Sequence, residues 1–273
     1  MTNENLLPDY DEPPVIEVVC GVHFQRIDSL IAPYLGLLWE KIRKEFPLCK
    51  EVAPLAPVIE RFGANDQSTA ELAIPDILSL SRIWFESQDG NGLIQVQRDR
   101  FLHNWKKEHD KDEYPHFDFV IKNFRTNFET FKAFIKENNL GSIQLLQCEL
   151  TYVNHIPQGE AWTKLSDIGK IFPDFSWRND TQRFLPTLEA CNWQTSFVLP
   201  EREGRLRTSI RLGKRRSDNH PIILFELTAR GIGTDKNDSG IWPWFDLAHK
   251  WIVEGFTDLT SKEVQQNVWR RKR

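Results

Sequence analysis

The pattern of apolar and polar positions predicts a first half that begins with a strand and ends with a long helix. Residues 15–24 (VIEVVCGVHF) are rich in β-branched side chains and alternate between two faces. Residues 30–46 carry apolar side chains at three- and four-residue steps, as an amphipathic helix does. Residues 82–87 and 93–106 flank an Asp-Gly-Asn-Gly turn and predict a hairpin. The closing helix over 114–138 is predicted from one apolar stripe: Phe117, Val120, Ile121, Phe124, Phe128, Phe131 and Ile135.

The second half repeats this order. A strand over 143–156 is followed by a short helix over 165–172. Three further strands are predicted, at 183–200, 205–214 and 221–230, and a closing helix is predicted over 241–269. Between the halves' regular elements, residues 48–81 are interrupted by prolines and predict irregular structure, with a short extended piece at 58–62.

Together these elements predict an α+β protein made of two β-α-β(n)-α halves. The expected architecture is a curved antiparallel sheet covered on one face by two long helices, as in TATA-binding-protein-like or helix-grip-like folds. The divisions are a polar arm at 1–14, a first half at 15–140 and a second half at 141–273, with the two halves in one continuous domain or in two. The pairs Glu17-x5-His23 and Glu149-x5-His155 occupy corresponding places in the two opening strands and suggest an internal duplication.

Composition narrows the class of protein. Hydrophobic residues make up 40% and charged residues 27% of 273, which is typical of an ordered globular chain. No apolar run approaches the roughly 20 residues that span a bilayer, and the start of the chain is acidic, so we expect a cytoplasmic protein that does not bind membranes. The four cysteines lack metal-ligand spacing, so we predict no metal site.

Charge is unevenly distributed around a net value of -4, which argues against wholesale nonspecific binding to nucleic acid. The first 17 residues are acidic, whereas 202–216 and 270–273 are strongly basic. Alternation places several arginines on sheet faces, with Arg98 and Arg100 expected on the same face as Val96. Such a face could bind phosphate or nucleic acid, or could be an ordinary solvated face. The candidate anion-binding residues are Arg98, Arg100, Arg205, Arg207 and Arg211.

Candidate polar residues for chemistry are Glu17, His23, Glu149 and His155. An even spacing puts each pair on one face of its strand, and carboxylates with imidazoles can act as general acids and bases. Six residues of strand span roughly 20 Å, so a site would need cross-strand pairing between the halves. The alternative is a structural role in a hydrogen-bonded sheet. No catalytic motif is present, and Gly231-Ile232-Gly233-Thr234 lacks the third glycine of a dinucleotide fingerprint, so we expect no cofactor.

Several segments resemble a sporadically distributed, functionally uncharacterised prokaryotic protein family. The resembling stretches lie between residues 13 and 156: 13–18 (PPVIEV), 36–47, 94–105, 113–115 (EYP) and 147–156 (QCELTYVNHI). The resemblance implies cargo of mobile or phage-defence loci and brings no catalytic residues.

The leading hypothesis is a non-enzymatic binding or regulatory component, of a phage-defence or toxin-antitoxin-like system, that engages a protein partner encoded nearby. The first alternative is nucleic-acid or nucleotide binding by the arginine-lined face, and the second is an enzyme that uses the Glu/His pairs. Homo-oligomers are compatible with all three. The face of the sheet left free by the helices is where we expect a functional surface.

Overall fold

A computed structural model describes residues 7–62, 81–175, 184–186, 188–233 and 240–273. One antiparallel sheet of nine strands organises this part of the chain, in the order β2-β3-β4-β5-β1-β6-β9-β8-β7. The strands are β1 (Val15–Phe24), β2 (Leu48–Val52), β3 (Arg82–Glu86), β4 (Gly92–Gln97), β5 (Arg100–Lys106), β6 (Leu145–Pro157), β7 (Asn192–Val198), β8 (Gly204–Lys214) and β9 (Pro221–Gly231). The helices are α1 (Ala32–Ile42), α2 (His116–Glu137), α3 (Ile168–Ile171), α4 (Ile241–Leu259) and α5 (Lys262–Asn267). The predicted α+β class is confirmed.

The two opening strands, β1 and β6, pair with each other at the middle of the sheet. Gly21 lies opposite Glu149, and the pairing continues from Val15 to Phe24. Each opening strand also pairs with the last strand of its own meander, β1 with β5 and β6 with β9. Residues far apart in the sequence are therefore brought side by side along this central seam.

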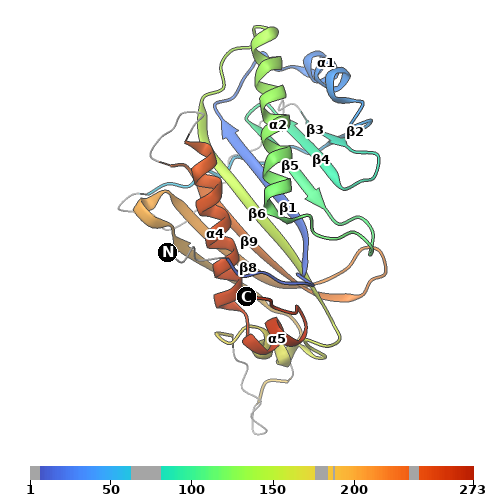
Figure 1. Ribbon diagram of the computed structural model, residues 1–273, viewed down its shortest axis with the longest axis vertical. Coiled ribbons are helices and arrows are strands. Elements are labelled where there is room, and N and C mark those ends of the chain that lie inside the picture. The colour runs from blue at the N-terminus through green and yellow to red at the C-terminus, as the bar shows by residue number, and fades with distance from the viewer. Residues whose placement is uncertain (1–6, 63–80, 176–183, 187, 234–239) are drawn as a thin grey trace.

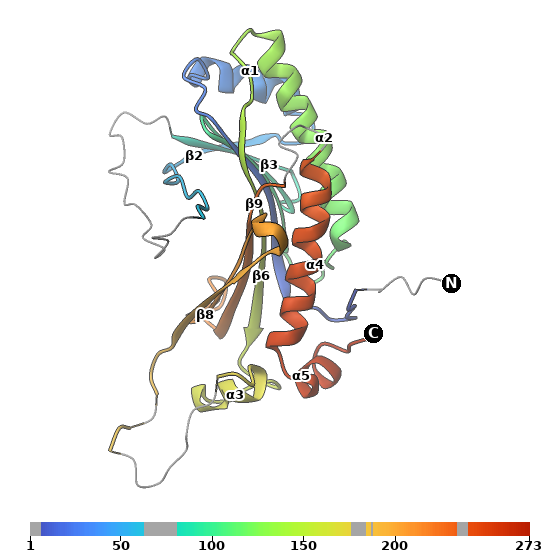
Figure 2. The same cartoon turned by 90° about the vertical axis from the view of Figure 1, so that its left-hand side faces the viewer.

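The two long helices, α2 and α4, lie on the same face of the sheet (Figures 1 and 2). Their apolar stripes bury against the alternate strand residues that point toward them, such as Val18, Cys20 and Val22 of β1. Aromatic rings join the layers: Phe101 of β5 stacks on Phe131 of α2 at 5.0 Å between centroids. Large, rigid rings therefore fill much of the space between sheet and helices.

The strand predicted over 93–106 is in fact two strands, joined by a two-residue turn at Arg98 and Asp99. Gln97 pairs with Arg100 across that turn. Because the chain reverses there, Val96 points to the helices whereas Arg100 points to the other face, and the prediction that Val96, Arg98 and Arg100 share a face is wrong. The β-favouring residues continue through the turn, so alternation alone predicts a single strand.

Other boundaries also differ from the predictions. Residues 48–52, predicted to be irregular, form the edge strand β2. The helix predicted over 241–269 ends at Leu259, and α5 begins after Ser261, whose hydroxyl accepts a hydrogen bond from the Val264 N–H and caps the new helix. Of the strand predicted over 183–200, β7 covers 192–198, while residues 183 and 187 lie outside the described residues.

The acidic arm and the basic tail bind each other. Tyr10 and Arg271 form an antiparallel bridge, and the Asp11 N–H donates to the Arg270 carbonyl at 3.2 Å. Ion pairs flank these bonds, including Lys272 with Asp11 at 2.7 Å. The basic tail is thus matched by acidic residues of the same chain. Within the described residues, no helix is long and apolar enough to cross a membrane.

Candidate functional site: a polar sheet face crossed by an extended segment

The sheet face opposite α2 and α4 carries polar side chains from neighbouring strands. Alternation turns Glu17 and His23 of β1 to this face, and it turns Gln147 and Glu149 of β6 the same way. The arginines of β8 and β9 follow: Arg205, Arg207, Arg211 and Arg230. We call this surface the polar face.

Glu149 lies at the centre of the polar face between a histidine and an arginine. Its carboxylate is 3.3 Å from His23 Nε2 and accepts a hydrogen bond from Arg230 Nε at 2.6 Å. Burial by itself raises the pKa of Glu149, but the contacts with His23 and Arg230 outweigh it and bring the pKa down to about 2. A carboxylate so strongly held in its ionised form is poorly suited to accept a proton near neutral pH.

The other two polar candidates do not join this cluster. Glu17 accepts a hydrogen bond from the Asn104 amide at 2.6 Å, and burial raises its pKa. It lies opposite Val153 in the β1–β6 pairing, whereas His23 lies opposite Gln147. His155 is further along β6, past Glu17, and burial lowers its pKa. Cross-strand pairing therefore unites His23 with Glu149 and leaves Glu17 and His155 apart from them.

The candidate arginines differ in their surroundings. Arg98 lies in the β4–β5 turn and donates from Nε to the Leu30 carbonyl at 3.2 Å. Arg100 is buried and forms a bidentate pair with Asp99, at 3.0 and 3.1 Å. Arg211 is half exposed and lies 3.7 Å from Glu226.

Arg205 and Arg207 both bind Glu60, which belongs to residues 53–62. Arg207 grips the Glu60 carboxylate through Nε at 2.6 Å and a terminal nitrogen at 2.9 Å. Arg205 donates to the same carboxylate at 2.8 Å and to the Arg61 carbonyl at 2.9 Å, and its guanidinium lies over the Phe62 ring at 4.1 Å. Burial favours a raised pKa for Glu60, yet the two guanidinium groups lower it.

Residues 53–62, which we call the crossing segment, lie on the side of the sheet away from α2 and α4 (Figure 2). Two buried glutamines hold its main chain. The Gln97 side-chain amide accepts from the Leu55 N–H at 2.9 Å and donates to the Leu55 carbonyl at 3.1 Å. The Gln147 amide accepts from the Glu60 N–H at 2.7 Å and donates to the Val58 carbonyl at 2.9 Å. The expectation of a sheet face left free by the helices is thus wrong for this part of the face.

A polar groove of about 450 Å³ lies beside the crossing segment, over β7, β8 and β9. It is lined by hydroxyl, amide and charged side chains: Gln194, Thr195, Ser196, Arg207, Thr208, Ser209, Arg211, Glu226, Thr228 and Arg230. Each of its three arginines has a carboxylate partner within 4 Å, namely Glu60, Glu226 or Glu149. Arginines paired with carboxylates in this way fix the positions of neighbouring side chains. They leave little net positive potential in the groove to attract a polyanion such as nucleic acid.

Four residues of this face are not among the candidates predicted from the sequence: Glu60, Gln97, Gln147 and Arg230. Arg230 and Gln147 sit on predicted strands beside the candidates, and alternation could have placed both on the polar face. Glu60 gave no signal, because its partners Arg205 and Arg207 are 145 and 147 residues away in the chain. Among the described residues, no group of three His, Cys, Asp or Glu side chains could hold a metal ion.

The geometry on this face recognises main-chain amides and a carboxylate. No protein-family model matches the chain, and no curated protein matches it. The site must therefore be interpreted from its own contacts.

Proposed function

We propose that this chain is a non-enzymatic binding protein whose polar face holds an extended polypeptide segment that carries a carboxylate. The crossing segment occupies this site in cis, and a segment of a protein partner replaces it. One observation supports this most strongly: Gln97 and Gln147 each use both halves of a side-chain amide to bind main-chain groups of an extended segment.

Main-chain recognition tolerates many side chains, because every non-proline residue offers the same N–H and C=O groups. The crossing segment fits that mode, since three of its apolar side chains are partly exposed. Leu55, Val58 and Ile59 are 39%, 42% and 36% exposed. The Glu60 carboxylate makes the charge-assisted bonds, and the Phe62 ring lies under the Arg205 guanidinium. A carboxylate at the Glu60 position is therefore the main expected sequence requirement of a partner.

The binding strength comes mainly from the carboxylate and its two arginines. The Glu60 side chain is 3% exposed and forms charge-assisted bonds to both guanidinium groups. Hydrogen bonds to charged groups contribute about 1.5–3 kcal/mol each in proteins. A tethered segment has an effective concentration in the millimolar range, so a partner has to exceed this advantage to replace it.

The test uses a fluorescent peptide with the sequence of residues 53–62 (APLAPVIERF), added in trans. Its binding is measured by fluorescence anisotropy against the intact chain and against the Glu60→Ala variant, in which the cis segment has lost its anchor. We expect the variant to bind the peptide at least about tenfold more tightly than the intact chain, as the loss of one charge-assisted bond in the competitor requires. A peptide with Gln in place of its Glu should lose this binding.

Two double variants provide the matched comparison. Adding Arg207→Ala to Glu60→Ala should abolish peptide binding, whereas adding Arg211→Ala should leave it unchanged, because Arg211 lies on the same strand face but pairs with Glu226. If the Glu60→Ala protein does not bind the peptide, or if Arg207→Ala has no effect, the segment is a fixed part of the fold and the proposal is wrong. Salt-dependent binding of a labelled single-stranded oligonucleotide that requires Arg207 would favour the nucleic-acid alternative instead.

We also propose that the two halves are copies of one unit, as in TATA-binding-protein-like folds. Outward from the central β1–β6 seam, the sheet order is β5, β4, β3 on one side and β9, β8, β7 on the other, and the first side carries β2 as an additional edge strand. Each half then closes with a long helix, α2 or α4, on the same face (Figure 1). Superposition of residues 15–137 on residues 145–259 tests this duplication, and a match restricted to single elements would contradict it.

A cytoplasmic location and a partner encoded nearby, in a defence or toxin-antitoxin-like locus, stay predictions.

A further inference from the structure

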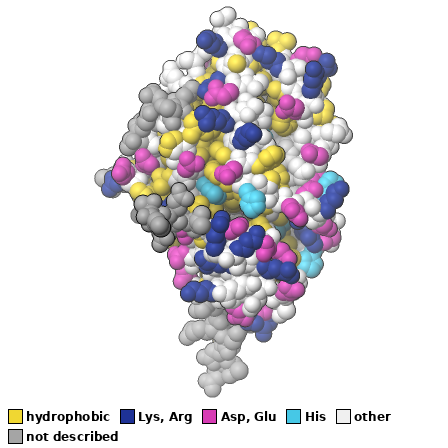
Figure 3. All heavy atoms as spheres, in the orientation of Figure 1, with side chains coloured by type: hydrophobic (Ala, Val, Ile, Leu, Met, Phe, Trp, Pro, Cys, Tyr) yellow, Lys and Arg dark blue, Asp and Glu magenta, His cyan; other side chains and the backbone are white. Residues whose placement is uncertain are grey.

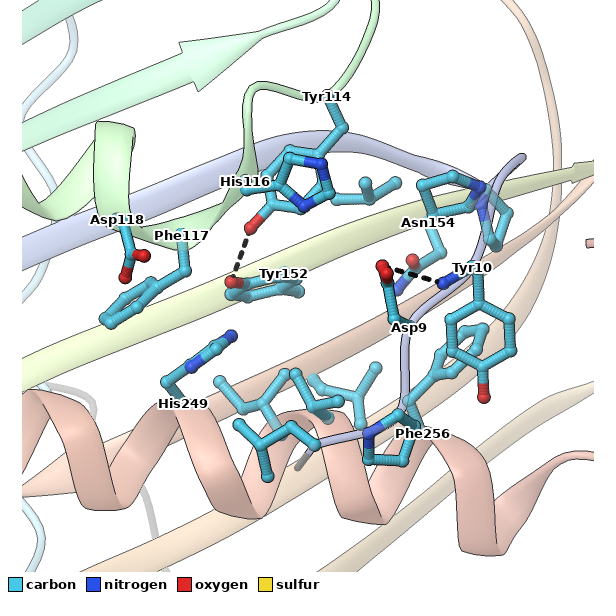
Figure 4. A pocket seen from close by; sticks show the side chains of 18 of the residues that line it. Asp9, Tyr10, Tyr114, His116, Phe117, Asp118, Tyr152, Asn154, His249 and Phe256 are labelled. Atoms are coloured by element: carbon cyan, nitrogen blue, oxygen red, sulfur yellow. Dashed lines mark hydrogen bonds between the residues drawn. The ribbon is translucent and has the colours of Figure 1, made fainter. Parts of the chain in front are cut away.

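A second site lies on the other side of the sheet, where the acidic arm passes α2 and α4. A cavity of about 410 Å³ opens there, bounded by the arm, the start of α2, strand β6 and helix α4 (Figure 4). Three of the four tyrosines in the chain line it: Tyr10, Tyr114 and Tyr152. Its size falls at the lower end of the range of small-molecule sites, about 300–1,000 Å³. On this helix-covered face, charges of both signs are interspersed and histidines lie among apolar side chains (Figure 3).

Aromatic and aliphatic side chains form most of the wall. Phe117 begins the apolar stripe of α2, and its ring stacks on the imidazole of His249 from α4, with 3.9 Å between centroids and 9° between planes. Phe256, about two turns after His249 on α4, packs edge-on against Tyr10 with 5.5 Å between ring centroids. Flat surfaces from two helices and the arm thus face one space, which suits a planar guest.

Two tyrosine hydroxyls supply a hydrogen-bond donor inside the cavity. The hydroxyl oxygens of Tyr114 and Tyr152 are 2.8 Å apart (Figure 4). Burial raises the pKa of both, so both stay protonated at neutral pH. Their mutual bond uses one of the two hydroxyl hydrogens, and the other remains to donate to a guest.

His249 supplies a donor and an acceptor without a charge. Its ring stands up from α4 toward Tyr152, as Figure 4 shows. Burial lowers the pKa of His249 to about 4, although nearby Asp118 acts in the opposite direction. Within the described part of the chain, neither ring nitrogen has a hydrogen-bond partner. A neutral imidazole has one N–H and one lone pair, so it can pair with a ring nitrogen or an amide edge.

We propose that this cavity binds a small, uncharged heteroaromatic ring of purine-base or nucleoside type. The ring would lie among the aromatic walls, accept from the tyrosine pair and exchange a hydrogen bond with His249. The carboxylates of Asp9 and Asp118 line the cavity and would repel a phosphate on the guest. Arg273, which also lines it, is 4.0 Å from the Asp9 carboxylate, so its positive charge is already partly balanced. This site is independent of the polar face, because it lies on the opposite side of the sheet.

The test titrates the full chain with adenine, adenosine, guanosine and adenosine monophosphate, by calorimetry and saturation-transfer NMR. We expect one of the uncharged probes to saturate a single site and the monophosphate to bind more weakly than adenosine. Tyr152→Phe and His249→Phe keep a ring in place but remove the polar atoms, and each should weaken binding at least about tenfold, the loss of roughly one hydrogen bond. Tyr34→Phe is the matched control, since Tyr34 is the one tyrosine that does not line the cavity.

A filling variant keeps the proposal falsifiable if a polar substitution disturbs the fold. Val253 lines the cavity from α4, and Val253→Trp should abolish binding while the thermal unfolding midpoint shows that the variant is folded. The proposal is overturned if no uncharged probe binds the intact chain. It is also overturned if binding persists in Val253→Trp, or if Tyr152→Phe and His249→Phe both leave the affinity unchanged.

Discussion

The ionised state of Glu149 makes a measurable prediction about stability. We expect Glu149→Gln to lower the free energy of unfolding at neutral pH, because the substitution keeps the shape of the side chain but removes the charge that Arg230 and His23 contact. The pKa of Glu149 is lowered from 4.5 to about 2 in the folded protein. A difference of about 2.5 pH units at about 1.36 kcal/mol each corresponds to about 3 kcal/mol of stability at pH 7.

The sign of the pH dependence follows from the same shift. A carboxyl whose pKa is lower in the folded state stabilises the fold above its unfolded pKa, and this contribution is lost as the pH falls toward the folded value. For Glu149 the window runs from about pH 4.5 down to about pH 2, and the difference between the two proteins should shrink at pH 3 to less than half of its value at pH 7.

Urea denaturation of both proteins at pH 7, 4 and 3, followed by tryptophan fluorescence, measures this difference. Glu226→Gln is the control, because Glu226 lies on the neighbouring strand β9 but is 33% exposed, with Arg211 at 3.7 Å. Glu226→Gln should lower the free energy of unfolding by less than about 1 kcal/mol, because ion pairs at the surface contribute no more than that. A Glu149→Gln effect as small as that of Glu226→Gln, or one that does not change between pH 7 and pH 3, would show that the Glu149 charge does not stabilise the fold.

Three further predictions concern the fold. Gly231→Ala should lower the free energy of unfolding by at least about 2 kcal/mol, because a Cβ there would lie 1.9 Å from the Glu203 carbonyl oxygen. Gly213→Ala is the control, since a Cβ there meets no atom closer than 3.8 Å, and chemical denaturation compares the two variants. Phe101→Ala should cost about 3–5 kcal/mol through loss of its contacts with α2, while Phe119→Ala, at a side chain 51% exposed, should change stability by less than about 0.5 kcal/mol. His116 has a φ of 65°, so His116→Gly should raise the thermal midpoint by removing about 1 kcal/mol of strain.

Alternation along the strands was enough to predict much of the polar face. It placed His23 and Glu149 on one side of their strands, and the requirement for cross-strand pairing is met by the β1–β6 seam. Turn chemistry was less informative at Arg98 and Asp99, where neither residue is a glycine or proline. Long-range contacts were out of reach, because nothing local marks Glu60 as the partner of two arginines on β8.

The cavity was also absent from the sequence analysis, for a related reason. Tyr152 lies on the apolar face of its strand, where the pattern indicates only burial. A buried tyrosine needs a partner for its hydroxyl, and here that partner is Tyr114, which precedes α2 by two residues. The angle at which α2 and α4 cross the sheet decides which aromatic rings face each other, and hydrophobic periodicity does not specify that crossing angle.

The central position of β1 has a consequence for biosynthesis. This strand is translated before both of its partners, since Glu17 pairs with Lys106 on one side and Val153 on the other. Its apolar residues therefore lack a strand partner until β5 has been translated, and the second partner, β6, follows later still, at roughly 5–20 residues per second. The nascent chain therefore exposes an apolar, β-branched strand for several seconds before β5 can cover one of its edges and β6 the other.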